Sequence, residues 1–173
     1  MKKIIQSTLV ISFLLFAFSS FAQPDKSKRP SPPALVKEKV GDVTITIDYS
    51  RPLVKSRTIG KDLEPKDGEV WRTGANEATI FEVDKDVTVE GKPLEEGKYG
   101  LFTLVSGDEW TIIFNKNWNQ WGAFSYKEDE DVLRVKVKAS KADPFAEQFT
   151  INISEEGVIT LLWGDRKVTF TVK

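Results

Sequence analysis

The sequence predicts an all-β fold: an antiparallel two-sheet sandwich of about ten short strands, with a jelly-roll-like double sheet as one form of it and a closed barrel as the alternative. Three observations predict this class. Apolar and polar residues alternate with a period of two along most of the chain, short turn sequences separate the alternating segments, and no segment has the spacing of an amphipathic helix. No unit repeats at a fixed period, which disfavours a propeller or a solenoid.

The expected strands are short segments with one apolar face. That face is clearest in three sets of alternating positions: Val43, Ile45, Ile47 and Tyr49; Trp110, Ile112 and Phe114; Leu133, Val135 and Val137. The full set of expected strands is 43–49, 78–83, 87–90, 99–105, 110–114, 133–138, 148–154, 158–163 and 167–172. Gly, Asp and Ser gather between strands and predict tight turns at 41–42, 106–108, 155–157 and 164–166.

The first 22 residues have the parts of a secretory signal peptide. Lys2 and Lys3 give a positive start, residues 4–18 form an apolar run, and small side chains stand at Ser20 and Ala22. The run is shorter than the roughly 20 residues that span a bilayer, and no cysteine follows for lipid attachment. We therefore expect cleavage after Ala22, a periplasmic or secreted protein, and no integral membrane segment after cleavage.

Cleavage would leave a mature chain of single-domain size. Of the 173 residues, 151 follow Ala22, which is enough for one buried core. Residues 23–33 alternate prolines with charges and predict a disordered or polyproline-like leader, while residues 34–173 predict a single sandwich domain. Without Lys2 and Lys3 the chain has 23 basic and 26 acidic residues, a net charge of −3. This balance disfavours nucleic acid as a partner.

Two residue types are missing from the chain, and their absence narrows the chemistry. Without cysteine there is no disulfide, thiolate nucleophile or cysteine-ligated metal. Without histidine there is no usual serine-hydrolase triad and no histidine-ligated metal. We expect no cofactor and no metal, and any catalysis would have to use carboxylates, lysine, tyrosine or bound calcium.

Two stretches, 50–76 and 115–131, break the alternation and are too long for tight turns. Long loops on a rigid sheet are where binding residues concentrate. In the first loop the candidate ligand-binding residues are Arg51, Arg72, Asn76 and Glu77. Arg72 could bind a carboxylate or phosphate, and Asn76 and Glu77 could hydrogen-bond a ligand. The alternative is that Arg72 and Glu77 pair internally while Trp71 fills the core.

In the second loop the candidate residues are Asn115, Trp118 and Trp121. Indole rings flanked by amide side chains suit a carbohydrate, because the rings stack on sugar C–H faces and the amides bond hydroxyls. The alternative is that Trp121, Phe124 and Tyr126 anchor the loop and leave Trp118 as the exposed ring. We expect the two loops to meet, with Arg72 and Trp118 bordering one depression; if each loop only covers part of the sheets, the two residues lie apart.

An acidic run at 128–131 follows this loop. Four carboxylates could supply calcium ligands, but the run lacks the alternating pattern of a calcium loop, so a solvated turn is favoured. Two carboxylates could also serve as a glycosidase pair.

Several motifs, in this order, resemble an exported bacterial family known as domain of unknown function 2911. They are YSRP at 49–52, VWRTGANEAT at 70–79, GKYGLFT at 97–103, WTIIFNK at 110–116 and QWGAF at 120–124. The resemblance spans nearly the whole mature chain and implies an exported single domain. It implies no catalytic residues.

Three functions therefore stay open. The first is a non-catalytic exported or envelope-associated ligand-binding module, with a carbohydrate as candidate ligand and a glycan or an envelope protein as candidate partner. The second is a carbohydrate-active enzyme that uses carboxylates. The third is a structural module that contacts another protein.

Overall fold

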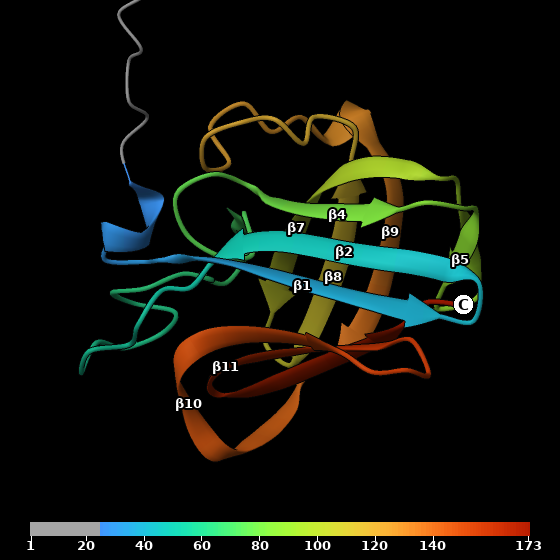
Figure 1. The fold of residues 1–173 in the computed structure, drawn as a ribbon. Helices are drawn as coiled ribbons and strands as arrows, with labels where there is room; N and C mark the ends of the chain where they lie inside the picture. The colour runs from blue at the N-terminus through green and yellow to red at the C-terminus, as the bar shows by residue number, and fades with distance from the viewer. Residues whose placement is uncertain (1–24) are drawn as a thin grey trace, which may run out of the picture.

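The computed structural model describes residues 25–173. The expected signal peptide, 1–22, and the cleavage after Ala22 lie outside the described residues. In the described part the chain forms eleven strands and two short 3-10 turns, with no α-helix. The strands pair antiparallel and form layers (Figure 1), which confirms the predicted all-β sandwich.

The larger layer is an open seven-stranded sheet. Its strands follow the order β1-β2-β4-β7-β8-β9, and β3 pairs with β7 outside this path. Among the described residues β1 and β9 remain the two edges, so the sheet does not close on itself. The strands are β1 (Pro33–Val40), β2 (Val43–Ser50), β3 (Val70–Trp71), β4 (Thr79–Val83), β7 (Gly97–Ser106), β8 (Glu109–Asn115) and β9 (Asp131–Lys138).

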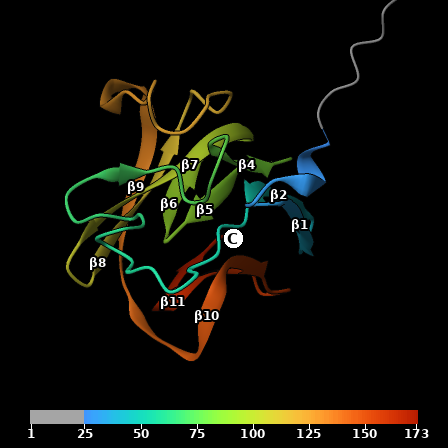
Figure 2. The same ribbon diagram turned by 90° about the vertical axis from the view of Figure 1, so that its left-hand side faces the viewer.

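The second layer is a long two-stranded ribbon made of β10 (Ser140–Ile153) and β11 (Val158–Thr171). The ribbon lies beneath the large sheet in Figure 1 and curls back on itself at its far end, as Figure 2 shows from the side. The predicted turn at 164–166 is wrong, because β11 runs through it. Register shifts flank the Ala146–Gly164 pair, so Gly164 marks an irregularity within a continuous ladder.

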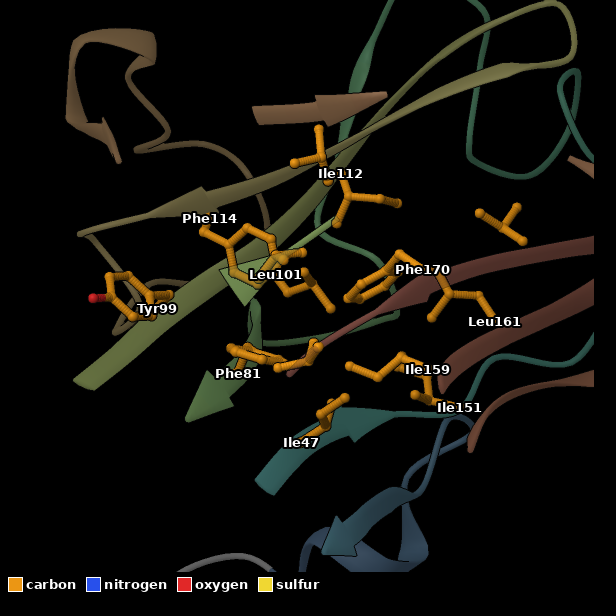
Figure 3. Close-up of a cluster of buried hydrophobic side chains, with 14 of the residues drawn as sticks. Ile47, Phe81, Tyr99, Leu101, Ile112, Phe114, Ile151, Ile159, Leu161 and Phe170 are labelled. Atoms are coloured by element: carbon orange, nitrogen blue, oxygen red, sulfur yellow. The ribbon is translucent and has the colours of Figure 1, made fainter. Parts of the chain in front are cut away.

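The core lies between the large sheet and the ribbon (Figure 3), where alternate residues of both layers interdigitate. Phe114 of β8 packs edge-to-face on Phe170 of β11, with ring centres 6.2 Å apart. On the large sheet Phe81 packs against the same Phe114 ring at 4.9 Å. The predicted apolar faces of 43–49 and 110–114 therefore point into this core, as the period-two pattern requires.

Three strands were missed in the sequence: β1, β3 and the short β6 (Lys92–Leu94), which pairs with β5 (Val87–Val89). Strand β1 follows a run of prolines and is an edge strand with alternating lysines, so its pattern is weaker than that of a central strand.

The described part of the expected leader, residues 25–33, contacts the rest of the domain. A 3-10 turn at Lys26–Lys28 leads into an extended segment, and the Pro32 carbonyl accepts a hydrogen bond from the Arg51 amide at 2.9 Å. Within residues 25–173 no helix is long and apolar enough to cross a membrane.

Candidate functional site

The two long loops meet through a short stretch of antiparallel backbone, here called the loop bridge, formed by residues 76–78 and 120–122. Glu77 pairs with Trp121, the Gly122 amide donates to the Asn76 carbonyl at 2.9 Å, and the Ala78 amide donates to the Gln120 carbonyl at 3.0 Å. Asn76 and Trp121 line one depression beside this bridge, and Glu77 and Gln120 line another.

The larger of these, the polar depression, has a volume of about 450 Å³. Both loops and the ribbon contribute to it. Trp121 of the second loop borders it, and Trp71 and Trp163 lie at its base. The polar side chains around it are Ser31, Arg57, Asp62, Glu64, Lys66, Arg72 and Asn76. The depression thus combines three indole rings with donors and acceptors of both charge signs.

The base of the polar depression is fixed by buried tryptophans. Trp71 and Trp163 are each 2% exposed. The Trp71 ring nitrogen donates to the Gly74 carbonyl at 2.9 Å, and that of Trp163 donates to the Glu64 carbonyl at 2.8 Å. Both rings stand edge-on to Phe149 of β10. The first loop is therefore held against the ribbon by paired indoles rather than left to move freely.

Arg72 is held in the polar depression by an unusual turn. Thr73, fully buried, and Asn76 both have positive φ, 53° and 62°. Asparagine tolerates this region, but a β-branched threonine rarely adopts it. Hydrogen bonds over-determine the turn, since the Thr79 hydroxyl donates to the Thr73 carbonyl at 2.7 Å. Backbone strain of this kind clusters at binding sites, so we infer that the turn fixes the position of Arg72 for a binding role.

The Arg72 side chain is only partly satisfied by the protein. Its Nη1 donates to Glu64 Oε2 at 3.1 Å, while its Nε is buried without a hydrogen-bond partner. Glu64 therefore orients one edge of the guanidinium, and Arg72 retains donor capacity. The predicted internal pair of Arg72 with Glu77 does not form: Arg72 pairs with Glu64, and Glu77 pairs with Arg29 and Lys26.

The second depression, here called the small depression, has a volume of about 150 Å³ and lies on the outer face of β2 and β4. Asp48, Glu77 and Trp118 line it. Asp48 is partly exposed, but partial desolvation raises its pKa; the nearby Lys26 opposes this shift, and the neighbouring Glu77 adds to it.

Glu77 is occupied by the N-terminal segment. Arg29 Nη1 lies 2.7 Å from Glu77 Oε2 and 3.0 Å from Oε1, and Lys26 Nζ lies 3.1 Å from Oε1. Partial burial would raise the pKa of Glu77, but the hydrogen bonds from Arg29 and Lys26 outweigh it and hold the pKa below its usual value. The Arg29 guanidinium also stands 5.8 Å from the centre of the Trp121 ring.

Two predicted binding residues have structural partners instead. Arg51 donates to the Phe149 carbonyl at 3.1 Å and to Thr150 Oγ1 at 2.8 Å, which ties the first loop to β10. Asn115 is fully buried, and its amide donates to the Lys127 carbonyl and Asp131. Neither side chain lines either depression.

The expectation about exposed rings is wrong. Trp121 and Phe124 are 55% and 88% exposed, while Trp118 is half-buried beneath Lys98, whose Nζ lies 5.6 Å from the ring centre. Of the three rings expected to anchor the loop, only Tyr126 does so, packing 5.0 Å from Phe102. The loops meet as predicted, but Arg72 shares its depression with Trp121 and not with Trp118.

Several lining residues were not singled out as candidates from the sequence: Ser31, Arg57, Asp62, Lys66 and Trp163 for the polar depression, and Asp48 for the small one. The charged residues of 57–66 belong to the first long loop, which was already predicted to carry binding residues. Their charge could therefore have identified them as candidates. No feature of the sequence identified Trp163, because it lies in a predicted strand and has the pattern of an ordinary core residue.

The acidic run folds as a turn. Glu128–Glu130 forms a 3-10 turn, and Asp131 accepts hydrogen bonds from Asn115 at 2.7 Å and Tyr126 at 2.7 Å. Among residues 25–173, no group of three or more acidic side chains is arranged to hold a metal ion. Asp131 therefore joins the two ends of the second loop through these hydrogen bonds.

Comparison with known proteins places these features in a family. The family model described as a protein of unknown function (DUF2911) matches residues 31–172, a range that includes all eleven strands and both loops. No curated protein and no solved structure matches the chain.

Proposed function

Because the chain belongs to the DUF2911 family, whose function is unknown, we propose a function from the site itself: a non-catalytic, exported binding protein that holds a hydroxyl-rich ligand such as a glycan in the polar depression. The observation that carries this proposal is the exposed Trp121 ring beside a rim of charged side chains. The volume of the polar depression, about 450 Å³, falls within the range of roughly 300 to 1,000 Å³ for small-molecule sites.

The rim supports a hydroxyl-rich ligand rather than a strongly charged one. Arg57, Lys66 and Arg72 offer donors, and Asp62 and Glu64 offer acceptors. A hydroxyl group both donates and accepts, so a sugar can use both kinds of side chain at once. The Trp121 ring supplies a flat apolar surface on which a sugar ring can stack.

A carboxylate-dependent carbohydrate-active enzyme is the second candidate. Asp48 and Glu77 line one depression beside Trp118, and their pKa values move in opposite directions, as in acid–base pairs. It ranks second because Arg29 and Lys26 already neutralise Glu77. Release of reducing ends from a glycan, abolished by Asp48→Asn, would establish it over binding alone.

Calorimetric titration of the mature protein with peptidoglycan fragments and neutral oligosaccharides tests the binding proposal. We expect one class to bind, and Trp121→Ala and Arg72→Ala each to weaken binding about tenfold or more, because each removes a direct contact. Phe124→Ala is the matched control, since this exposed ring lies outside the depression. Equal binding by Trp121→Ala and the unsubstituted protein would exclude this site.

Export is tested separately. Mass spectrometry of the protein recovered outside the cytoplasm is expected to find Gln23 at the N-terminus, given the small residues at Ser20 and Ala22. Retention of residues 1–22 would overturn the proposed cleavage.

A further inference from the structure

The N-terminal segment lies across the loop bridge and touches both depressions. Lys26 and Pro33 line the small depression, and Ser31 lines the polar one. Between them Arg29 contacts both members of the bridge pair, Glu77 and Trp121. The N-terminal segment therefore contacts Asn76, Glu77 and Trp121, which were predicted from the sequence to bind a ligand and lie 45 or more residues further along the chain.

The contacts of this segment are those of a bound peptide. Arg29 has a carboxylate and an aromatic face as partners, and its Nη1 lies 2.7 Å from Glu77 Oε2. Two backbone carbonyls follow: Ser31 accepts from Asn76 Nδ2 at 2.9 Å, and Pro32 accepts from the Arg51 amide at 2.9 Å. One side-chain anchor and two main-chain contacts fix both the register and the direction of the segment.

The conformation of the segment is also that of a recognised peptide. Arg29 has φ −68° and ψ 148°, the polyproline II region. Pro30, Pro32 and Pro33 follow and restrict the chain to extended conformations. Because such a segment loses little entropy on binding, aromatic-lined surfaces commonly bind proline-rich peptides.

We propose that Glu77, Trp121 and Asn76 form a recognition site for an extended basic peptide in which arginine precedes prolines, and that residues 26–32 fill this site in cis. Charge complementarity selects the occupant, because Glu77 receives two cations from the segment. None of the contacts depends on the covalent link to β1, so a peptide of the same chemistry from a second protein can make the same set. The cis segment competes with it through a high effective concentration.

The experiment uses the full mature chain and a synthetic peptide with the sequence of residues 25–33. Arg29→Ala removes the cis anchor, so calorimetry should detect binding of the peptide to this variant and binding at least about tenfold weaker to the unsubstituted protein. The same peptide with alanine at its arginine should not bind. Failure of the peptide to bind the Arg29→Ala protein overturns the proposal.

Matched variants distinguish specific recognition of the peptide from non-specific attraction of a basic peptide to a protein that has lost one positive charge. Lys28→Ala removes the neighbouring cation, which is 84% exposed and pairs only with Asp25 among the described residues, and should behave as the unsubstituted protein. Glu77→Gln added to Arg29→Ala should weaken peptide binding about tenfold or more. Equal peptide affinity with and without Glu77→Gln overturns the proposal. Arg72→Ala should leave peptide binding intact, so failure of the glycan proposal remains distinguishable from failure of this one.

Discussion

The two long loops solve the same problem, fixing an irregular chain to a sheet, in different ways. The first loop is held by apolar contact: Trp71, Trp163 and Phe149 pack edge-to-face in the core. The second loop is held mainly by polar contact: Asn115 and Tyr126 both donate to Asp131, and the Tyr126 ring also packs on Phe102. The first loop buries Trp71 and displays charges, whereas the second buries Asn115 and Gln120 and displays Trp121 and Phe124.

This difference shows that residue type alone does not indicate which side chains are free to bind. A tryptophan is an anchor in one loop and an exposed ring in the other, and an asparagine is exposed at 119 but buried at 115. What decides is the partner supplied by a distant segment. The predictions below test the two modes of anchoring, beginning with the apolar one.

Loss of the apolar anchor should cost the most. Trp71→Ala removes a ring that is 2% exposed, so we expect a loss of about 3 to 5 kcal/mol in the free energy of unfolding. Urea denaturation followed by circular dichroism measures it. Trp121→Ala is the matched control and should change stability by less than about 0.5 kcal/mol. Similar losses in both variants would contradict the contrast between the loops.

Loss of the polar anchor should cost less. Asn115→Ala leaves the Asp131 carboxylate, the Lys127 carbonyl and the Asn117 amide without this partner, and we expect a loss of about 2 kcal/mol. Asn119→Ala, at an exposed position of the same loop, serves as control in the same urea titration. A loss as large as that of Trp71→Ala would show that the two loops do not differ in this way.

A further effect, confined to alkaline pH, should come from Tyr126. Burial and the hydrogen bond to Asp131 raise its pKa from 10.0 to about 12. Because the folded protein keeps this proton more tightly than the unfolded chain, its contribution is complete below pH 10 and is lost as the pH rises towards 12. Denaturation midpoints should therefore fall across this window, and Tyr126→Phe should flatten the fall. An unchanged pH dependence in Tyr126→Phe would assign the fall to other groups.

Much of the fold could be predicted because one face of most strands is buried. The alternation at 43–49 is a direct imprint of that burial. Residues 110–114 alternate in sequence too, although β8 is buried on both faces. The bounds of the ribbon could not be predicted, because Gly164 and Asp165 have the composition of a tight turn and also that of a bulge within a strand. Only the partner, here Ala146 of β10, decides between the two.

The candidate site could be predicted in outline but not in its pairings. Loop length identified the two segments, and side-chain chemistry identified the residues Arg72, Asn76 and Trp121. The loop bridge, which brings Glu77 opposite Trp121, depends on the pairing of two distant segments. The same holds for Trp163, which completes the polar depression from a strand about 90 residues beyond Trp71.

The order of the layers along the chain has a consequence for folding. Every strand of the large sheet lies before residue 139, and the ribbon that covers its apolar face is made of Ser140–Ile153 and Val158–Thr171. Until that last fifth of the chain is synthesised, Phe81, Leu101 and Phe114 have no opposing layer to pack on. A growing or truncated chain would thus present an uncovered apolar sheet, which is an aggregation hazard. Folding of this domain therefore waits for its C-terminal hairpin.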